Sequence, residues 1–271
     1  MESMKCFSEK NRVFVSFGGK CSFQCLHCYT FSQNFQTENF YSIKDIISNL
    51  QEKKQFDIIY VSGYKENFEN PNEGLDLVEE LFAVFNCHIL FTTRNVFSKE
   101  QIIRVSNLNR LMKESNKFLF ACVSISAYNS YKKIEPNNKI PSPEKRIEFL
   151  KQLYENDIIT FLTLRPVYPT LFIQTKEYLE IIEKTYNFCD AIIASGIRID
   201  DYIKDRLKTF PKNYMAKLEK WHCFNDMPIE EVNVKSELSE IETFCKDRNV
   251  LIFEASIPAM NHFYNNEKRR Q

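Results

Sequence analysis

The sequence contains little glycine, little tryptophan and no net charge: five glycines, one tryptophan, and 36 Lys and Arg against 36 Asp and Glu. A balanced charge lacks the overall basic field that nucleic-acid-binding proteins use, although a local basic patch stays compatible with this count. No run of 18 or more apolar residues occurs, so no membrane-spanning helix is predicted. The first twelve residues lack the apolar segment of a signal peptide, and we therefore expect a cytoplasmic protein.

The nine cysteines are an odd number, and their positions do not show the paired spacing of a disulfide framework. Free thiols or metal ligands in a reducing compartment are the better interpretation. With 44% apolar and 27% charged residues, the chain can bury a core of its own. Its 271 residues suit one large α/β domain or two small ones.

Strand and helix patterns alternate along most of the chain, which predicts an α/β fold with a parallel sheet covered by helices. Right-handed crossovers would wind this sheet into a full or partial (β/α)6 barrel. The expected strands are 12–17, 57–63, 87–93, 118–126, 158–164 and 190–197. The expected helices are 42–53, 74–85, 98–113, 142–156, 175–186 and 200–208, with Ser42, Ser98 and Ser142 as N-caps.

The pattern changes near residue 210. Residues 210–271 contain one clear helix, 236–248, and one further strand, 250–256, and no Pro- or Gly-rich linker separates them from the rest. We expect residues 1–209 to form the (β/α)6 core. Residues 210–271 are expected to form a small α+β extension that packs on it.

The segment GGKCSFQCLHCYTF, residues 18–31, carries Cys21, Cys25 and Cys28 in the spacing C-x₃-C-x₂-C. It follows the first expected strand and therefore lies at the carboxyl edge of the sheet, where α/β proteins place their chemistry. Three thiolates can hold three irons of a 4Fe–4S cubane, which usually takes four cysteines. The fourth iron would then be open to an exogenous ligand, as a catalytic zinc keeps one open position.

A zinc site is the main alternative interpretation of this segment, with His27 or a remote cysteine as the fourth ligand. Zinc modules normally pair two cysteine knuckles, and no second C-x-x-C occurs in the sequence. Cys6 and Cys245 are scattered elsewhere in the sequence, and Cys87, Cys122 and Cys189, which fall at or in expected strands, are expected to be buried inert thiols. Cys223, next to His222, is a candidate second ligand or reactive group.

The cysteine spacing after the first strand of a β/α protein resembles the radical S-adenosylmethionine (SAM) superfamily. The resemblance implies a radical SAM barrel, a 4Fe–4S cluster on the three cysteines, and SAM chelated to the open iron. It also implies an electron donor such as flavodoxin or ferredoxin. One electron would cleave SAM to methionine and a 5′-deoxyadenosyl radical that abstracts hydrogen from a substrate.

The same resemblance suggests further SAM contacts at the strand ends. Ser62 and Gly63 match the segment that meets the methionine amino group, although the usual G-G-E form is absent and Glu66 is displaced. The resemblance places Ser124 and Ser126, on one face of the fourth expected strand, at the ribose and Gly196 at the adenine. Arg165 has the chemistry to clamp a carboxylate. Ordinary strand-end turns, small inward side chains and a solvated charge are the structural alternatives at these positions.

Residues 123–169 are similar to the spore photoproduct lyase-like branch, in Glu135–Pro136, Pro143, Arg146–Ile147, Pro166 and Pro169. That branch carries a hydrogen-donating cysteine at the end of the second strand, where this sequence reads IYVSG. Three functions stay open: a radical SAM lyase or oxidoreductase, a DNA photoproduct lyase, and a non-catalytic zinc or cluster protein. The sequence does not select a substrate among small molecules, peptides and nucleotides.

Overall fold

The computed structural model describes residues 8–9, 11–32, 39–53, 55–221 and 227–268. One eight-stranded sheet dominates it, in the order β1-β2-β3-β4-β5-β6-β7-β11. Its strands are β1 (Ser8–Glu9), β2 (Arg12–Val15), β3 (Ile58–Val61), β4 (His88–Thr93), β5 (Leu119–Ser124), β6 (Ile159–Val167), β7 (Ala191–Gly196) and β11 (Ile252–Phe253). Only β1 pairs antiparallel; every other neighbour in this sheet is parallel. The six predicted strands and the α/β partial barrel are confirmed.

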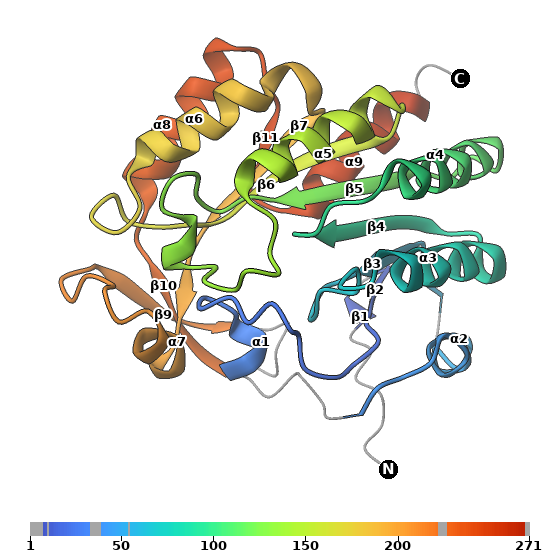
Figure 1. The fold of residues 1–271 in the computed structure, drawn as a ribbon, viewed down its shortest axis with the longest axis horizontal. Helices are drawn as coiled ribbons and strands as arrows, with labels where there is room; N and C mark the ends of the chain where they lie inside the picture. Colours follow the sequence, from blue (N-terminus) through green and yellow to red (C-terminus); the bar gives the residue numbers. More distant parts are fainter. Residues whose placement is uncertain (1–7, 10, 33–38, 54, 222–226, 269–271) are drawn as a thin grey trace.

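Helices follow the strands as the sequence pattern predicts (Figure 1). They are α1 (Tyr29–Ser32), α2 (Ile43–Gln51), α3 (Pro71–Phe85), α4 (Lys99–Glu114), α5 (Pro143–Glu155), α6 (Thr175–Thr185), α7 (Asp201–Arg206), α8 (Lys235–Asp247) and α9 (Ser256–Lys268). Helix α3 begins three residues earlier than predicted, because Pro71 opens it and the Asn70 side chain accepts the Asn72 N–H. No described helix is both long and apolar enough to cross a membrane.

Two of the predicted N-caps form complete capping boxes. The Ser42 hydroxyl accepts the Asp45 N–H while the Asp45 carboxylate accepts the Ser42 N–H, and Ser98 pairs with Gln101 in the same way. Ser142 occupies the cap position of α5 but makes no side-chain bond to the helix backbone. The hydroxyls of Ser42 and Ser98 therefore cap the first turn of their helices, whereas the hydroxyl of Ser142 does not.

We expect Ser42→Ala and Ser98→Ala each to lower the free energy of unfolding by about 1 kcal/mol, because each leaves a helix N–H without its acceptor. Urea denaturation followed by circular dichroism measures this loss. Ser142→Ala is the matched control and should cost less than either. A larger loss at Ser142 than at Ser98 would contradict the capping assignment.

The two faces of the sheet are buried by different partners. Alternate strand residues such as Ile59, Val61 and Ile89 belong to the large core cluster under the surrounding helices. The intervening residues, among them Ile58, Leu90, Phe120 and Phe161, pack with Ala259 and Met260 of α9 on the inner face. Because both faces are apolar, the strands read as continuous hydrophobic runs. Helix α9, which has no counterpart in the prediction, therefore fills one end of the partial barrel.

A second, three-stranded antiparallel sheet has the order β8-β10-β9, formed by β8 (Arg198–Ile199), β9 (Ala216–Trp221) and β10 (Met227–Val232). The chain then returns through α8 and adds β11 to the main sheet beside β7. Residues beyond 210 thus contribute both to the small sheet and to the barrel.

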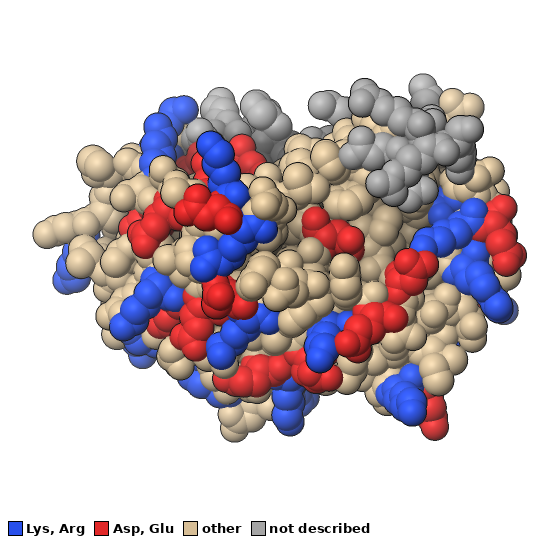
Figure 2. Space-filling view, turned by 90° about the horizontal axis from the view of Figure 1, so that it is seen from above, with Lys and Arg blue, Asp and Glu red and all other residues tan. Residues whose placement is uncertain are grey.

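Surface charges of both signs are intermixed. Figure 2 shows Lys and Arg side chains alternating with Asp and Glu side chains over the described part of one face. This distribution agrees with the equal numbers of acidic and basic residues in the chain.

Candidate functional site

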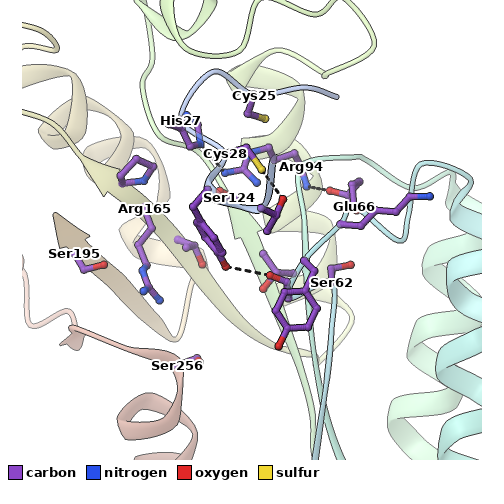
Figure 3. Close-up of a pocket in the computed structure, with 18 of the residues that line it drawn as sticks. Cys25, His27, Cys28, Ser62, Glu66, Arg94, Ser124, Arg165, Ser195 and Ser256 are labelled. Atoms are coloured by element: carbon purple, nitrogen blue, oxygen red, sulfur yellow. Dashed lines mark hydrogen bonds between the residues drawn. The ribbon is translucent and has the colours of Figure 1, made fainter. Parts of the chain in front are cut away.

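A cavity of about 470 Å³ opens at the carboxyl ends of the parallel strands. Residues at or just after the ends of β3 to β7 line it: Ser62, Arg94, Ser124, Arg165 and Ser195 (Figure 3). The cysteine loop lies over one end, and the start of α9 lies at the other. The parallel topology produces this arrangement, since all strands of one direction end at the same edge.

All three cysteines of the loop line the cavity. Cys21 and Cys25 are buried, Cys28 is half-buried, and all three pack with Phe23 and Ile140. A turn closed by the Cys28 N–H to the Cys25 carbonyl at 3.1 Å keeps these two thiols on one short segment. Three soft thiol donors on a shielded loop form a donor set that suits an iron–sulfur cluster.

Glycine and long-range hydrogen bonds shape this loop. Gly18 and Gly19 have φ angles of +70° and +71°, and a Cβ on Gly18 would collide with the Asn39 carbonyl. The loop backbone is then held by four hydrogen bonds from three distant segments, around residues 69, 134–137 and 206. These bonds are Ser22 N–H to Glu69 Oε1 (2.9 Å), Asn137 Nδ2 to Ser22 O (2.6 Å), Leu26 N–H to Ile134 O (2.9 Å) and Arg206 Nη2 to Gln24 O (2.8 Å).

A buried ion network lies behind the cysteines. Glu135, which is fully buried, accepts Arg94 Nε at 2.8 Å and Arg146 Nη2 at 2.6 Å. Arg146 also donates to the Ser124 carbonyl at 2.6 Å, and Arg94 Nη2 lies 3.3 Å from His27 Nε2. The network therefore joins the cysteine loop to the ends of β4 and β5.

Burial sets the protonation states of this region. It raises the pKa of the Cys21 thiol to about 12 and also raises that of Cys25, so metal binding must release protons there. Burial, with Arg94 beside it, lowers the pKa of His27 to about 3, which keeps the imidazole neutral. Burial alone would raise the pKa of Glu135, but Arg146 and Arg94 outweigh it and hold this pKa at about 2.

The segment after β3 lines the cavity through Ser62 and Gly63. Ser62 has a φ of +73°, and its hydroxyl accepts the Asn67 N–H at 3.1 Å. The Tyr29 hydroxyl donates to the Gly63 carbonyl at 3.2 Å, which ties this turn to the cysteine loop. Glu66 also lines the cavity, but its carboxylate accepts the backbone N–H groups of Arg94 and Phe68.

The remaining predicted residues divide into two groups. Ser124, Arg165 and Gly196 line the cavity. Ser126 does not: it is fully buried, and its hydroxyl donates to the Arg165 carbonyl at 2.7 Å. Ser126 can therefore act on the cavity only through the position of Arg165.

The other cysteines lie elsewhere. Cys87, Cys122, Cys189 and Cys245 are buried and do not line the cavity, as expected for inert thiols. Cys6 and Cys223, the latter a candidate second ligand, lie outside the described residues.

The sequence did not lead us to predict that Arg94, Ser195 or the start of α9 would line the cavity. Arg94 follows the expected strand 87–93 at the carboxyl edge of the sheet, and this position was an available signal. Glu135 and Arg146 were noticed as features of a resemblance, without their ion pairing. Nothing local in the sequence places Ser256 against the cavity, because α9 arrives there from the far end of the chain.

No protein-family profile matches the sequence, and neither does any curated protein. Solved structures do match. A spore photoproduct lyase variant with bound AdoMet and dinucleoside spore photoproduct aligns at a TM-score of 0.66 and 12% identity, over 89% of this chain and 75% of that one. SuiB of Streptococcus suis bound to S-adenosylmethionine aligns at 0.58 and 14%, over 91% of this chain and 50% of that one.

TsrM of Kitasatospora setae, a radical SAM methyltransferase with cobalamin and a [4Fe–4S] cluster, aligns at 0.53 and 9%, over 76% of this chain and 39% of that one. This chain has the radical SAM fold. The resemblance predicted from the cysteine spacing is thus confirmed at the level of the fold. The chain spans three quarters of the lyase but only about half of SuiB, so the radical SAM core is what these proteins share with it.

Proposed function

We propose that this protein is a radical SAM enzyme in which Cys21, Cys25 and Cys28 bind a 4Fe–4S cluster at the mouth of the cavity. The observation that carries the proposal is that all three thiols of one loop line the same cavity, at the carboxyl edge of a parallel sheet. When bound, the cluster would supply one electron to SAM, which breaks into methionine and a 5′-deoxyadenosyl radical.

The protein's own part is to bind, orient and shield. Ser62, Gly63, Ser124 and Gly196 are the proposed contacts to SAM, because they line the cavity at the ends of three strands, β3, β5 and β7. The apolar Phe23 and Ile140 pack on the cysteines and limit the access of water to them. The reacting group of the substrate would enter the same cavity.

The function is tested by reconstituting the protein with iron and sulfide in the absence of oxygen. We expect a brown protein with about four irons per chain, and 5′-deoxyadenosine and methionine in equal amounts once SAM and dithionite are added. A protein that takes up iron but leaves SAM intact under these conditions would contradict the proposal.

A zinc site is the second candidate, and one observation favours it. Donor atoms of Cys25, His27 and Glu135 all lie within 4.8 Å of one another, and His27 Nδ1 has no hydrogen-bond partner among the described residues. The two arginines bound to Glu135 oppose this site, because they occupy the carboxylate and would repel a cation. A colourless protein purified with one zinc per chain and unable to take up iron would favour zinc.

A further inference from the structure

Basic side chains outnumber acidic ones around the cavity. Its lining contains the cations Arg12, Lys65, Arg94, Arg165 and Arg198, but only two carboxylates, those of Glu66 and Glu254. The whole chain has equal numbers of both signs, so this excess is local to the cavity. It favours a negatively charged ligand.

Most of these cations already have partners. Arg94 is paired with Glu135, and Arg198 with Glu231 at 3.3 Å. Arg12 stacks on the Phe14 ring at 4.3 Å and donates to Ser256 Oγ at 3.4 Å. The positive charges of Arg94, Arg198 and Arg12 are therefore already engaged within the protein. A ligand would have to bind another cation of the lining.

Arg165 is different. Among the described residues its guanidinium has neither a hydrogen bond nor an ion pair, although the residue is half-buried at the end of β6. Figure 3 shows its side chain extending away from Cys25 and Cys28, into the space near Ser195 and Ser256. A guanidinium held in a cavity without a partner is costly, and a bidentate anion would remove that cost.

Ser195 supplies an independent observation at the same place. The residue is 6% exposed and lines the cavity, and its hydroxyl has no hydrogen-bond partner among the described residues. On the other side, Ser256 Oγ accepts a bond from Arg12, which leaves its own proton free to be donated. Ser256 also opens the 13-residue helix α9, whose N-terminus adds positive potential.

We propose that this end of the cavity binds an oxyanion of the substrate, a carboxylate or a phosphate, between the Arg165 guanidinium and the hydroxyls of Ser195 and Ser256. The inference rests on the proposed function and narrows its substrate class to anions. It also changes the role expected of Arg165 from its sequence position. The guanidinium extends away from the cysteines, so it would clamp the substrate and not the carboxylate of SAM.

The test is calorimetric titration of the reconstituted protein, saturated with SAM, with inorganic phosphate and with acetate as the two probes. We expect Arg165→Gln to weaken the affinity for the tighter-binding probe about tenfold or more, since a charge-assisted bidentate contact is lost. Arg165→Lys should weaken it less, because lysine keeps the charge but not the fork. The tighter-binding probe identifies the group as a phosphate or a carboxylate.

Arg110→Gln is the matched control, because it removes the same charge from the exposed face of α4 and should leave probe affinity unchanged. The proposal is overturned if neither probe binds, or if Arg110→Gln and Arg165→Gln weaken binding equally. A loss of SAM affinity as large as the loss of probe affinity would assign Arg165 to SAM instead. The cluster and SAM cleavage are assayed in the same preparations, so a failure of the proposed function appears separately.

Discussion

Cys25→Ala is expected to abolish cluster binding and SAM cleavage together. Cys25 is 7% exposed and lies on the turn that carries Cys28, and no described cysteine outside this loop lines the cavity. With two thiols left on the loop, iron after reconstitution should fall from about four to below about one per chain. Iron analysis, the visible spectrum and chromatography of 5′-deoxyadenosine measure the three effects.

Cys245→Ala is the matched control, because Cys245 is a fully buried thiol of α8 outside the cavity. It should lose some stability through the small void it leaves, but keep its iron and its SAM cleavage. Intact SAM cleavage in Cys25→Ala would reject the cysteine loop as the cluster site. Loss of iron in both variants would instead indicate that cluster retention depends on general stability.

Glu135→Ala is expected to give the largest loss of stability among substitutions near the site, about 3–5 kcal/mol in the free energy of unfolding. The carboxylate has no exposed surface and neutralises two guanidinium groups, one of which, on Arg146, is also fully buried. Removing it leaves a buried positive charge without a counter-ion. Urea denaturation of the metal-free protein measures the loss without any contribution from bound iron.

Two further variants distinguish the effect of breaking the buried ion pair from the effect of shortening a glutamate side chain. Glu148→Ala removes an exposed carboxylate from α5 and should change the stability by less than about 0.5 kcal/mol. The double variant Glu135→Leu/Arg146→Leu removes both buried charges and should recover much of the loss seen in Glu135→Ala. A double variant that is less stable than Glu135→Ala would contradict this account.

Local sequence patterns were sufficient to predict most helices and strands and to place the cysteine loop at the carboxyl edge of the sheet. Continuous apolar runs predicted six strands, and they occur because both faces of the sheet are covered by other elements. Serine caps predicted the starts of α2 and α4. The cysteine spacing and the strand-end positions of Ser62, Gly63, Ser124, Arg165 and Gly196 follow from chain order alone. Ser126 is the exception, because its β-strand alternation with Ser124 stops where β5 ends.

Long-range packing decided the rest. Glu135 accepts a hydrogen bond from Arg94, which is 41 positions away in the sequence. Ser256 accepts one from Arg12, which is 244 positions away. No local pattern encodes such partners, since they are chosen by how the strands close and by which helix enters the open end of the barrel.

The sequence by itself therefore determined the alternation of strands and helices and the thiols at one edge of the sheet, because period and spacing are local properties. Only the tertiary structure decided which charges are neutralised and which, such as that of Arg165, face the cavity without an ion-pair partner among the described residues. Charge pairing depends on distances in space, and these exist only once the barrel has formed.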